Sequence, residues 1–80
     1  MKKYYQKEEL TFGRKERKDE FLIYNAKNRT IHLVPKEIYK VWKCCRNSSL
    51  EDIFKSTKIP KRTLMSILKL LKNKKLIKEI

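Results

Sequence analysis

Residues 49–80 read SLEDIFKSTKIPKRTLMSILKLLKNKKLIKEI, and the spacing of apolar residues in this stretch predicts two helices joined by a short turn. The turn is placed at Ile59 and Pro60, because proline disfavours a helical conformation in the residue before it. The second helix is predicted to begin at Pro60 or Lys61 and to end at Asn73, which can adopt a left-handed conformation. Its core face is formed by four apolar residues at helical spacing: Leu64, Ile67, Leu68 and Leu71.

The same stretch carries an excess of positive charge. From residue 58 to residue 80 there are eight basic residues and one acid, Glu79, a net charge of +7 in a chain whose total is +13. The basic residues are Lys58, Lys61, Arg62, Lys69, Lys72, Lys74, Lys75 and Lys78. A helix with one apolar face and one basic face predicts a surface that meets a polyanion, and nucleic acid is the first candidate. A simple solvated lysine surface is the alternative.

Upstream, residues 21–34 consist of two β-prone runs, FLIY and TIHLV, on either side of the polar segment NAKNR. This pattern predicts a β-hairpin whose loop has Asn28 in a left-handed conformation. A helix over 35–46 follows, and Ser48 with Glu51 fits a capping box at the start of the next helix. The core face of the helix over 35–46 is formed by Ile38, Val41, Trp42 and Cys45.

These elements predict an α+β fold of 80 residues. Residues 21–80 are expected to form a single small domain, with an N-terminal β-hairpin, three helices and a short C-terminal strand over 74–80. Residues 1–20 have seven basic and five acidic residues, and they are predicted to form a charged arm with one edge strand at 11–14. Because only one strand follows the third helix, we expect the hairpin or another chain to complete its sheet.

With the helix over 35–46 included, residues 36–80 resemble the winged helix-turn-helix family of transcription regulators. The family pattern is an apolar-acidic helix, a Thr-Gly-Ile/Leu-Pro/Ser turn, a recognition helix and a Gly-Leu-Ile segment before the first wing strand. Lys58 and Lys75 stand where the family has its two glycines, so both left-handed positions are expected to be strained or differently built. The resemblance implies a winged-helix-like domain that regulates transcription, with the third helix in the major groove of duplex DNA.

The family pattern also suggests roles for individual residues. The base-reading candidates are Lys61, Arg62, Thr63, Met65 and Ser66, and the phosphate-contact candidates are Lys58, Lys69, Lys72, Lys74 and Lys75. Arg62 is the strongest of these, because its planar guanidinium can pair bidentately with guanine. Regulators of this kind commonly form dimers on two half-sites. The apolar surface for a homodimer is expected from Tyr4, Tyr5, Leu10, Phe12 and Tyr39.

No residue set in the sequence indicates catalysis, a metal or a cofactor. Cys44 and Cys45 are adjacent, unlike the spaced pairs of a zinc site, and His32 has no neighbouring ligand set. We therefore expect that the chain is not an enzyme and has no cofactor, metal or small-molecule effector. No apolar run approaches the roughly 18 residues that span a bilayer, so we expect a cytoplasmic protein without a membrane partner.

Two other functions fit parts of the pattern. A β-hairpin ahead of three helices also resembles the peptide-recognition modules of peptide-maturation systems, which are winged-helix folds that bind a leader peptide by strand addition. RNA binding is a further alternative. The concentration of charge over 58–80 rather than on the hairpin favours duplex DNA.

Overall fold

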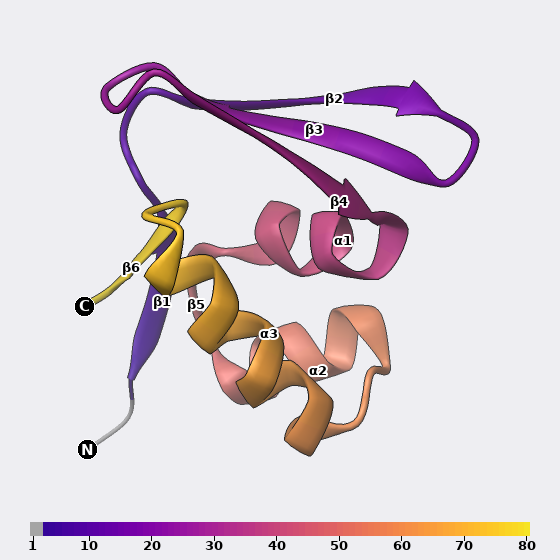
Figure 1. Ribbon diagram of the computed structural model, residues 1–80. Helices are drawn as coiled ribbons and strands as arrows, with labels where there is room; N and C mark the ends of the chain where they lie inside the picture. The colour runs from indigo at the N-terminus through magenta and orange to yellow at the C-terminus, as the bar shows by residue number, and fades with distance from the viewer. Residues whose placement is uncertain (1–2) are drawn as a thin grey trace.

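The computed structural model describes residues 3–80, which form an α+β fold with three helices and two three-stranded sheets (Figure 1). The strands are β1 (Tyr4–Lys7), β2 (Thr11–Arg17), β3 (Glu20–Asn25), β4 (Thr30–Pro35), β5 (Arg46–Ser49) and β6 (Ile77–Glu79). The helices are α1 (Lys36–Cys44), α2 (Leu50–Thr57) and α3 (Lys61–Asn73). The predicted α+β class and the three predicted helices are confirmed.

One sheet is an antiparallel meander with the strand order β2-β3-β4. The hairpin that was predicted from residues 21–34 corresponds to β3 and β4, and α1 packs against one face of this sheet (Figure 1). Its loop differs in detail from the prediction, because Arg29 rather than Asn28 is left-handed, with a φ of 56°. Asn28 instead donates its backbone N–H to the side-chain oxygen of Asn25.

The second sheet has the order β5-β1-β6, with β1 antiparallel to both neighbours. We expected residues 1–20 to form an arm with one edge strand; residues 4–7 and 11–17 instead form two strands in two different sheets, while residues 1–2 lie outside the described part. The expectation that the hairpin or another chain would complete the sheet of the last strand was wrong. The N-terminal strand β1 completes it.

The chain's only glycine permits close packing rather than a turn. A Cβ at Gly13 would lie 2.5 Å from Cζ3 of Trp42 and 2.6 Å from Cε1 of Tyr39, so β2 approaches α1 more closely than any larger residue would allow. The left-handed positions within residues 3–80 are all occupied by other residue types: Leu10, Arg29, Asn47, Lys58 and Lys75. This chain therefore builds its turns without glycine.

Helix α2 begins with a capping box one residue later than predicted. The backbone N–H of Asp52 donates to Oγ of Ser49 at 3.3 Å, and the N–H of Ser49 donates to the Asp52 carboxylate at 3.0 Å. Ser48 does not cap the helix, because it pairs with Tyr5 in the sheet. The pairing of β5 with β1 therefore sets the start of α2.

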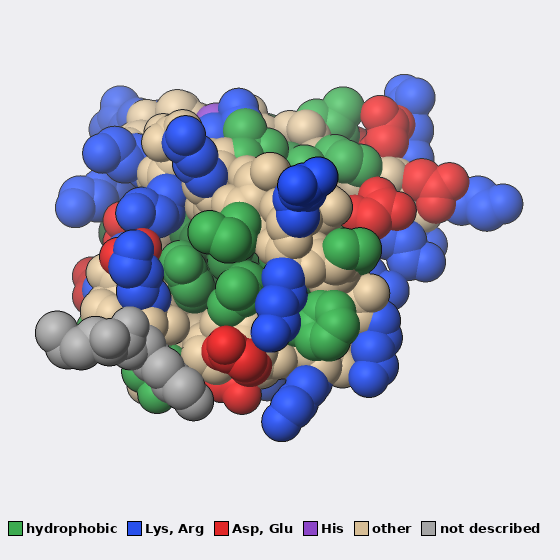
Figure 2. Space-filling model, turned by 90° about the horizontal axis from the view of Figure 1, so that it is seen from below, with side chains coloured by type: hydrophobic (Ala, Val, Ile, Leu, Met, Phe, Trp, Pro, Cys, Tyr) green, Lys and Arg blue, Asp and Glu red, His purple; other side chains and the backbone are tan. Residues whose placement is uncertain are grey.

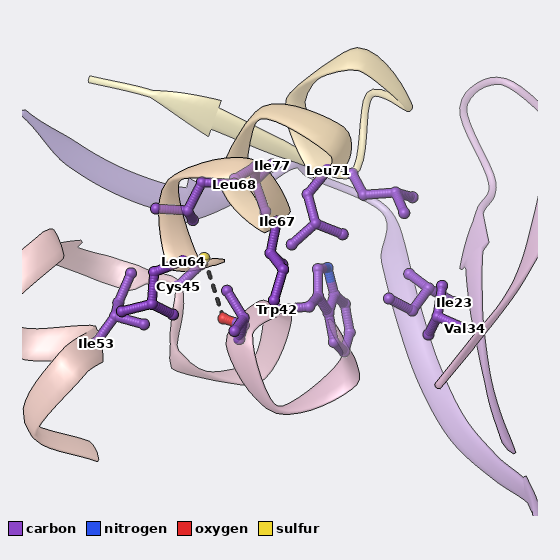
Figure 3. Close-up of a cluster of buried hydrophobic side chains, with 12 residues drawn as sticks. Ile23, Val34, Trp42, Cys45, Ile53, Leu64, Ile67, Leu68, Leu71 and Ile77 are labelled. Atoms are coloured by element: carbon purple, nitrogen blue, oxygen red, sulfur yellow. Dashed lines mark hydrogen bonds between the residues drawn. The ribbon is translucent and has the colours of Figure 1, made fainter. Parts of the chain in front are cut away.

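Buried side chains from the meander and the helices meet around Trp42. Figure 3 shows the indole of Trp42 between Ile23 and Val34 of the meander and the side chains of α3, and all of these residues are buried. The Sγ of Cys45 donates to the carbonyl of Val41 at 3.2 Å, the dashed line in Figure 3. The predicted core face of α3 is confirmed, because each of its four residues is buried: Leu64, Ile67, Leu68 and Leu71.

Candidate nucleic-acid interface

Helix α3 has a solvent face opposite its buried face. Arg62, Ser66 and Lys69 are separated by four and three residues, which aligns them on one side of a helix, and all three are exposed. The helix has 13 residues and no acid. Figure 2, seen from the side of α2 and α3, shows Lys and Arg side chains around and between a group of hydrophobic side chains. We call Arg62, Ser66 and Lys69 the basic row of α3.

The other base-reading candidates flank the basic row. Lys61 lies on the side of α2, with its Nζ 5.7 Å from the centre of the Phe54 ring. Met65 is 61% exposed, and Thr63 is exposed on the opposite flank. The structure therefore places all five candidates at the surface, but Lys61 and Thr63 face different sides of the helix.

The hydroxyl of Ser66 makes a hydrogen bond within its own helix. Its Oγ donates to the carbonyl of Arg62 at 3.3 Å, a common arrangement for a helical serine. The lone pairs of the hydroxyl stay exposed to solvent. An incoming ligand would thus first meet Ser66 as an acceptor.

The turn before α3 consists of three residues, 58–60. Lys58 is left-handed, with φ 60° and ψ 15°, and its N–H donates to the carbonyl of Phe54 at 2.7 Å. Ile59 packs against the buried core, which holds α3 against its neighbours. The winged helix-turn-helix pattern has a glycine at this left-handed position. In this chain Lys58 adopts the same left-handed conformation.

This geometry predicts opposite effects of one substitution on stability and on DNA binding. We expect Lys58→Gly to raise the free energy of unfolding by roughly 0.5–1 kcal/mol, because it relieves the steric cost of a left-handed Cβ, partly offset by glycine's greater chain entropy. Urea unfolding measures the change. If Lys58 contacts a phosphate, the same variant binds duplex DNA about 8-fold more weakly at 0.1 M salt.

The matched control is Lys55→Gly, which removes a lysine from the right-handed interior of α2. That variant should lose roughly 1 kcal/mol of stability. A Lys58→Gly variant that is destabilised to the same extent as Lys55→Gly would contradict the conformational argument.

The C-terminal end of α3 is tied to the hairpin loop. Lys75 is left-handed, with a φ of 61°, so it takes the terminating role that was predicted for Asn73, the last residue of the helix. Its carbonyl accepts a hydrogen bond of 2.8 Å from Nδ2 of Asn25, a side chain only 2% exposed. This bond fixes the backbone that carries Lys74 and Lys75.

Acidic side chains lie close to part of the predicted phosphate-binding set. Nζ of Lys72 lies 3.3 Å from Oε1 of Glu79, and Nζ of Lys3 lies 3.8 Å from the other oxygen of the same carboxylate. Lys75 shares a hollow with two acids and with Lys27 of the hairpin loop. Neither Arg62 nor Lys69 takes part in any of the four ion pairs identified among residues 3–80.

The titratable groups away from α3 have structural explanations. Burial, and to a lesser extent the neighbouring Cys44, raises the pKa of the Cys45 thiol to about 12, so this cysteine stays protonated and unreactive at neutral pH. Burial, with a smaller contribution from Lys74, lowers the pKa of His32. No group of three or more His, Cys, Asp or Glu side chains in residues 3–80 is placed to hold a metal ion.

The residues predicted for a homodimer surface are not all available. Tyr39 is half-buried and stacks on Phe21, with 4.3 Å between the ring centroids, and Tyr5 packs against the core. Exposed side chains remain at Tyr4, Leu10 and Phe12. The predicted surface therefore divides into packing residues and separate exposed positions.

Comparison with known proteins gave no match: no family model matches the sequence, and no curated protein or solved structure is significantly similar to it. Within residues 3–80 no helix has both the length and the apolar character needed to cross a membrane.

Proposed function

We propose that this chain binds duplex DNA with α3 in the major groove and regulates transcription. The observation that carries the proposal is the basic row of Arg62, Ser66 and Lys69, exposed on a helix that contains no acid. An α-helix fits the major groove, where Arg reads guanine and phosphates on either side attract cations. On this hypothesis Arg62 reads a base and Lys69 contacts a phosphate.

We further propose that α2 and α3 act as a helix-turn-helix unit in a winged-helix-like domain. The three helices contact one another pairwise, and α2 is the shorter helix that positions α3. Strand β1 pairs with β6, so it takes the place of the returning strand that a C-terminal wing would supply. This arrangement supports a winged-helix-like domain in which β1 and β6 together form the wing.

Titration with a labelled random duplex of about 20 base pairs at 50 and 200 mM salt tests the proposal. Six cations near α3 lie outside the ion pair with Glu79: Lys58, Lys61, Arg62, Lys69, Lys74 and Lys75. If six phosphates are neutralised, affinity should fall by about three decades between the two salt concentrations. A flat salt dependence would remove duplex DNA as the ligand.

Peptide binding by strand addition remains the second candidate, because within residues 3–80 β2 and β4 each have a strand partner on one side only. RNA binding is the third. A structured RNA of similar length in the same titration separates these functions, since an RNA-binding chain prefers the RNA. A peptide-binding chain has little affinity for either nucleic acid at 200 mM salt.

A further inference from the structure

The meander has an apolar face that no other element of residues 3–80 covers. Helix α1 lies against one face of the sheet, and the opposite face is open in Figure 1. Strand alternation places five apolar side chains on the open face: Phe12, Leu22, Tyr24, Ile31 and Leu33. We call these residues the outer sheet face.

Four of the five side chains of the outer sheet face are strongly exposed, and Leu22 is half-buried. Ile31 is 63% exposed, Phe12 and Leu33 are each 57% exposed, and Tyr24 is 39% exposed. A shallow hollow of about 470 Å³ on this face is lined by Phe12, Tyr24 and Ile31 together with Leu22. Isolated exposed apolar residues are ordinary, but a contiguous set on one sheet face marks an interaction surface.

The sequence of β3 supports a covered face. Phe21, Leu22, Ile23 and Tyr24 form a continuous apolar run, which is typical of strands that are covered on both sides. In residues 3–80 only one side is covered, by α1 at Ile23 and Phe21. The other side is free to contact another molecule.

The net charge of the outer sheet face favours a second copy of the chain over a polyanion. The charged residues on the same face are Arg14, Glu16, Arg17 and Glu20, because Arg17 pairs directly with Glu20 after a bulge at Glu16. Their formal net charge is 0 in a chain of +13. Nη2 of Arg14 lies 3.2 Å from a carboxylate oxygen of Glu16. Two copies can meet here without facing each other's excess of cations, whereas a polyanion gains no attraction at this surface.

We propose that two copies of this chain pair through their outer sheet faces as a two-fold symmetric dimer. Four of the five apolar side chains expose on the order of 100 Å² each, which gives on the order of 400 Å² per copy. With a polar rim the pair buries on the order of 1,000 Å², at the lower limit of specific interfaces. The proposal does not depend on DNA binding.

Sedimentation equilibrium without nucleic acid, at about 1 to 200 µM chain, tests the pairing. The expected mass is about twice the 9.8 kDa of the single chain. The double variant Ile31→Glu/Leu33→Glu should raise the dissociation constant of the dimer at least 100-fold, because it places like charges in the apolar centre. Arg14→Glu should also weaken the dimer, since it leaves three acids against one cation, Arg17, on each of the two facing surfaces.

Met65→Glu is the matched control, because Met65 is 61% exposed but lies on α3. It should leave the dimer intact, and circular dichroism should show all variants folded. A single-chain mass at about 200 µM, or a dimer that the double variant leaves unchanged, overturns the proposal. A monomer that loses single-stranded DNA binding on Phe12→Ala/Tyr24→Ala overturns it in favour of a base-stacking surface.

Discussion

Replacing both Arg62 and Lys69 by alanine is expected to weaken binding to duplex DNA about 60-fold at 0.1 M salt. Each cation that is removed from the interface reduces the number of counterions released on binding by about one. The two losses in free energy add, so the two fold-changes in affinity multiply. The salt slope should become shallower by about two charges. Fluorescence anisotropy at several salt concentrations measures both quantities.

The matched control is Lys36→Ala/Lys40→Ala. Both lysines are exposed residues of α1, four positions apart, and their loss gives the control the same net charge as the α3 variant. If the net charge of the chain alone draws it to DNA, this control loses as much affinity as the α3 variant, and the assignment of α3 fails. Arg62→Lys adds a second distinction. It keeps the charge but loses the bidentate fork, so affinity for random duplexes should persist while any sequence preference declines.

Replacing Trp42 by alanine is expected to cost about 3–5 kcal/mol in the free energy of unfolding, close to the whole stability of a small domain. Trp42 is 4% exposed and fills the space between the meander and α3 (Figure 3). Nζ of Lys7 also lies 4.6 Å from the centre of its ring, which attaches β1 to the same side chain. Urea unfolding followed by circular dichroism measures the loss.

Trp42→Phe keeps this prediction testable if the alanine variant does not fold. Nε1 of Trp42 has no hydrogen-bond partner within residues 3–80, so phenylalanine loses packing volume but no hydrogen bond. The expected cost is about 1–2 kcal/mol. Met65→Ala, at an exposed site, should stay within about 0.5 kcal/mol of the unchanged chain, and an equal loss in both variants would contradict a central role for Trp42.

The local pattern of apolar residues was sufficient to predict the helices and strands that bury one face. The helices at 50–57 and 61–73 and the hairpin of residues 20–35 agree with the sequence predictions, because apolar periodicity depends on residues a few positions apart. The same periodicity located the basic row, which is the side of α3 opposite its apolar face. Identifying the basic row required no knowledge of a partner element.

Strands β1 and β5 were missed for a physical reason. Arg46–Ser49 has the sequence RNSS, which favours a loop, and it becomes a strand only because β1 supplies its hydrogen-bond partners. The pairing joins segments about 40 residues apart, and no local signal records it. The open side of the meander did leave a signal in the run Phe21-Leu22-Ile23-Tyr24, which the sequence interpretation used only to predict a strand.

The sequence by itself determined where along the chain the helices form and which side of α3 meets solvent, because helical contacts repeat every three to four residues. Tertiary structure alone decided that β1 would join β6, that Asn25 would fix Lys75, and that acids would lie near Lys72 and Lys75. Those outcomes depend on segments distant in the chain meeting in space. Their free energy comes from pairing and burial that exist only once the whole domain has folded.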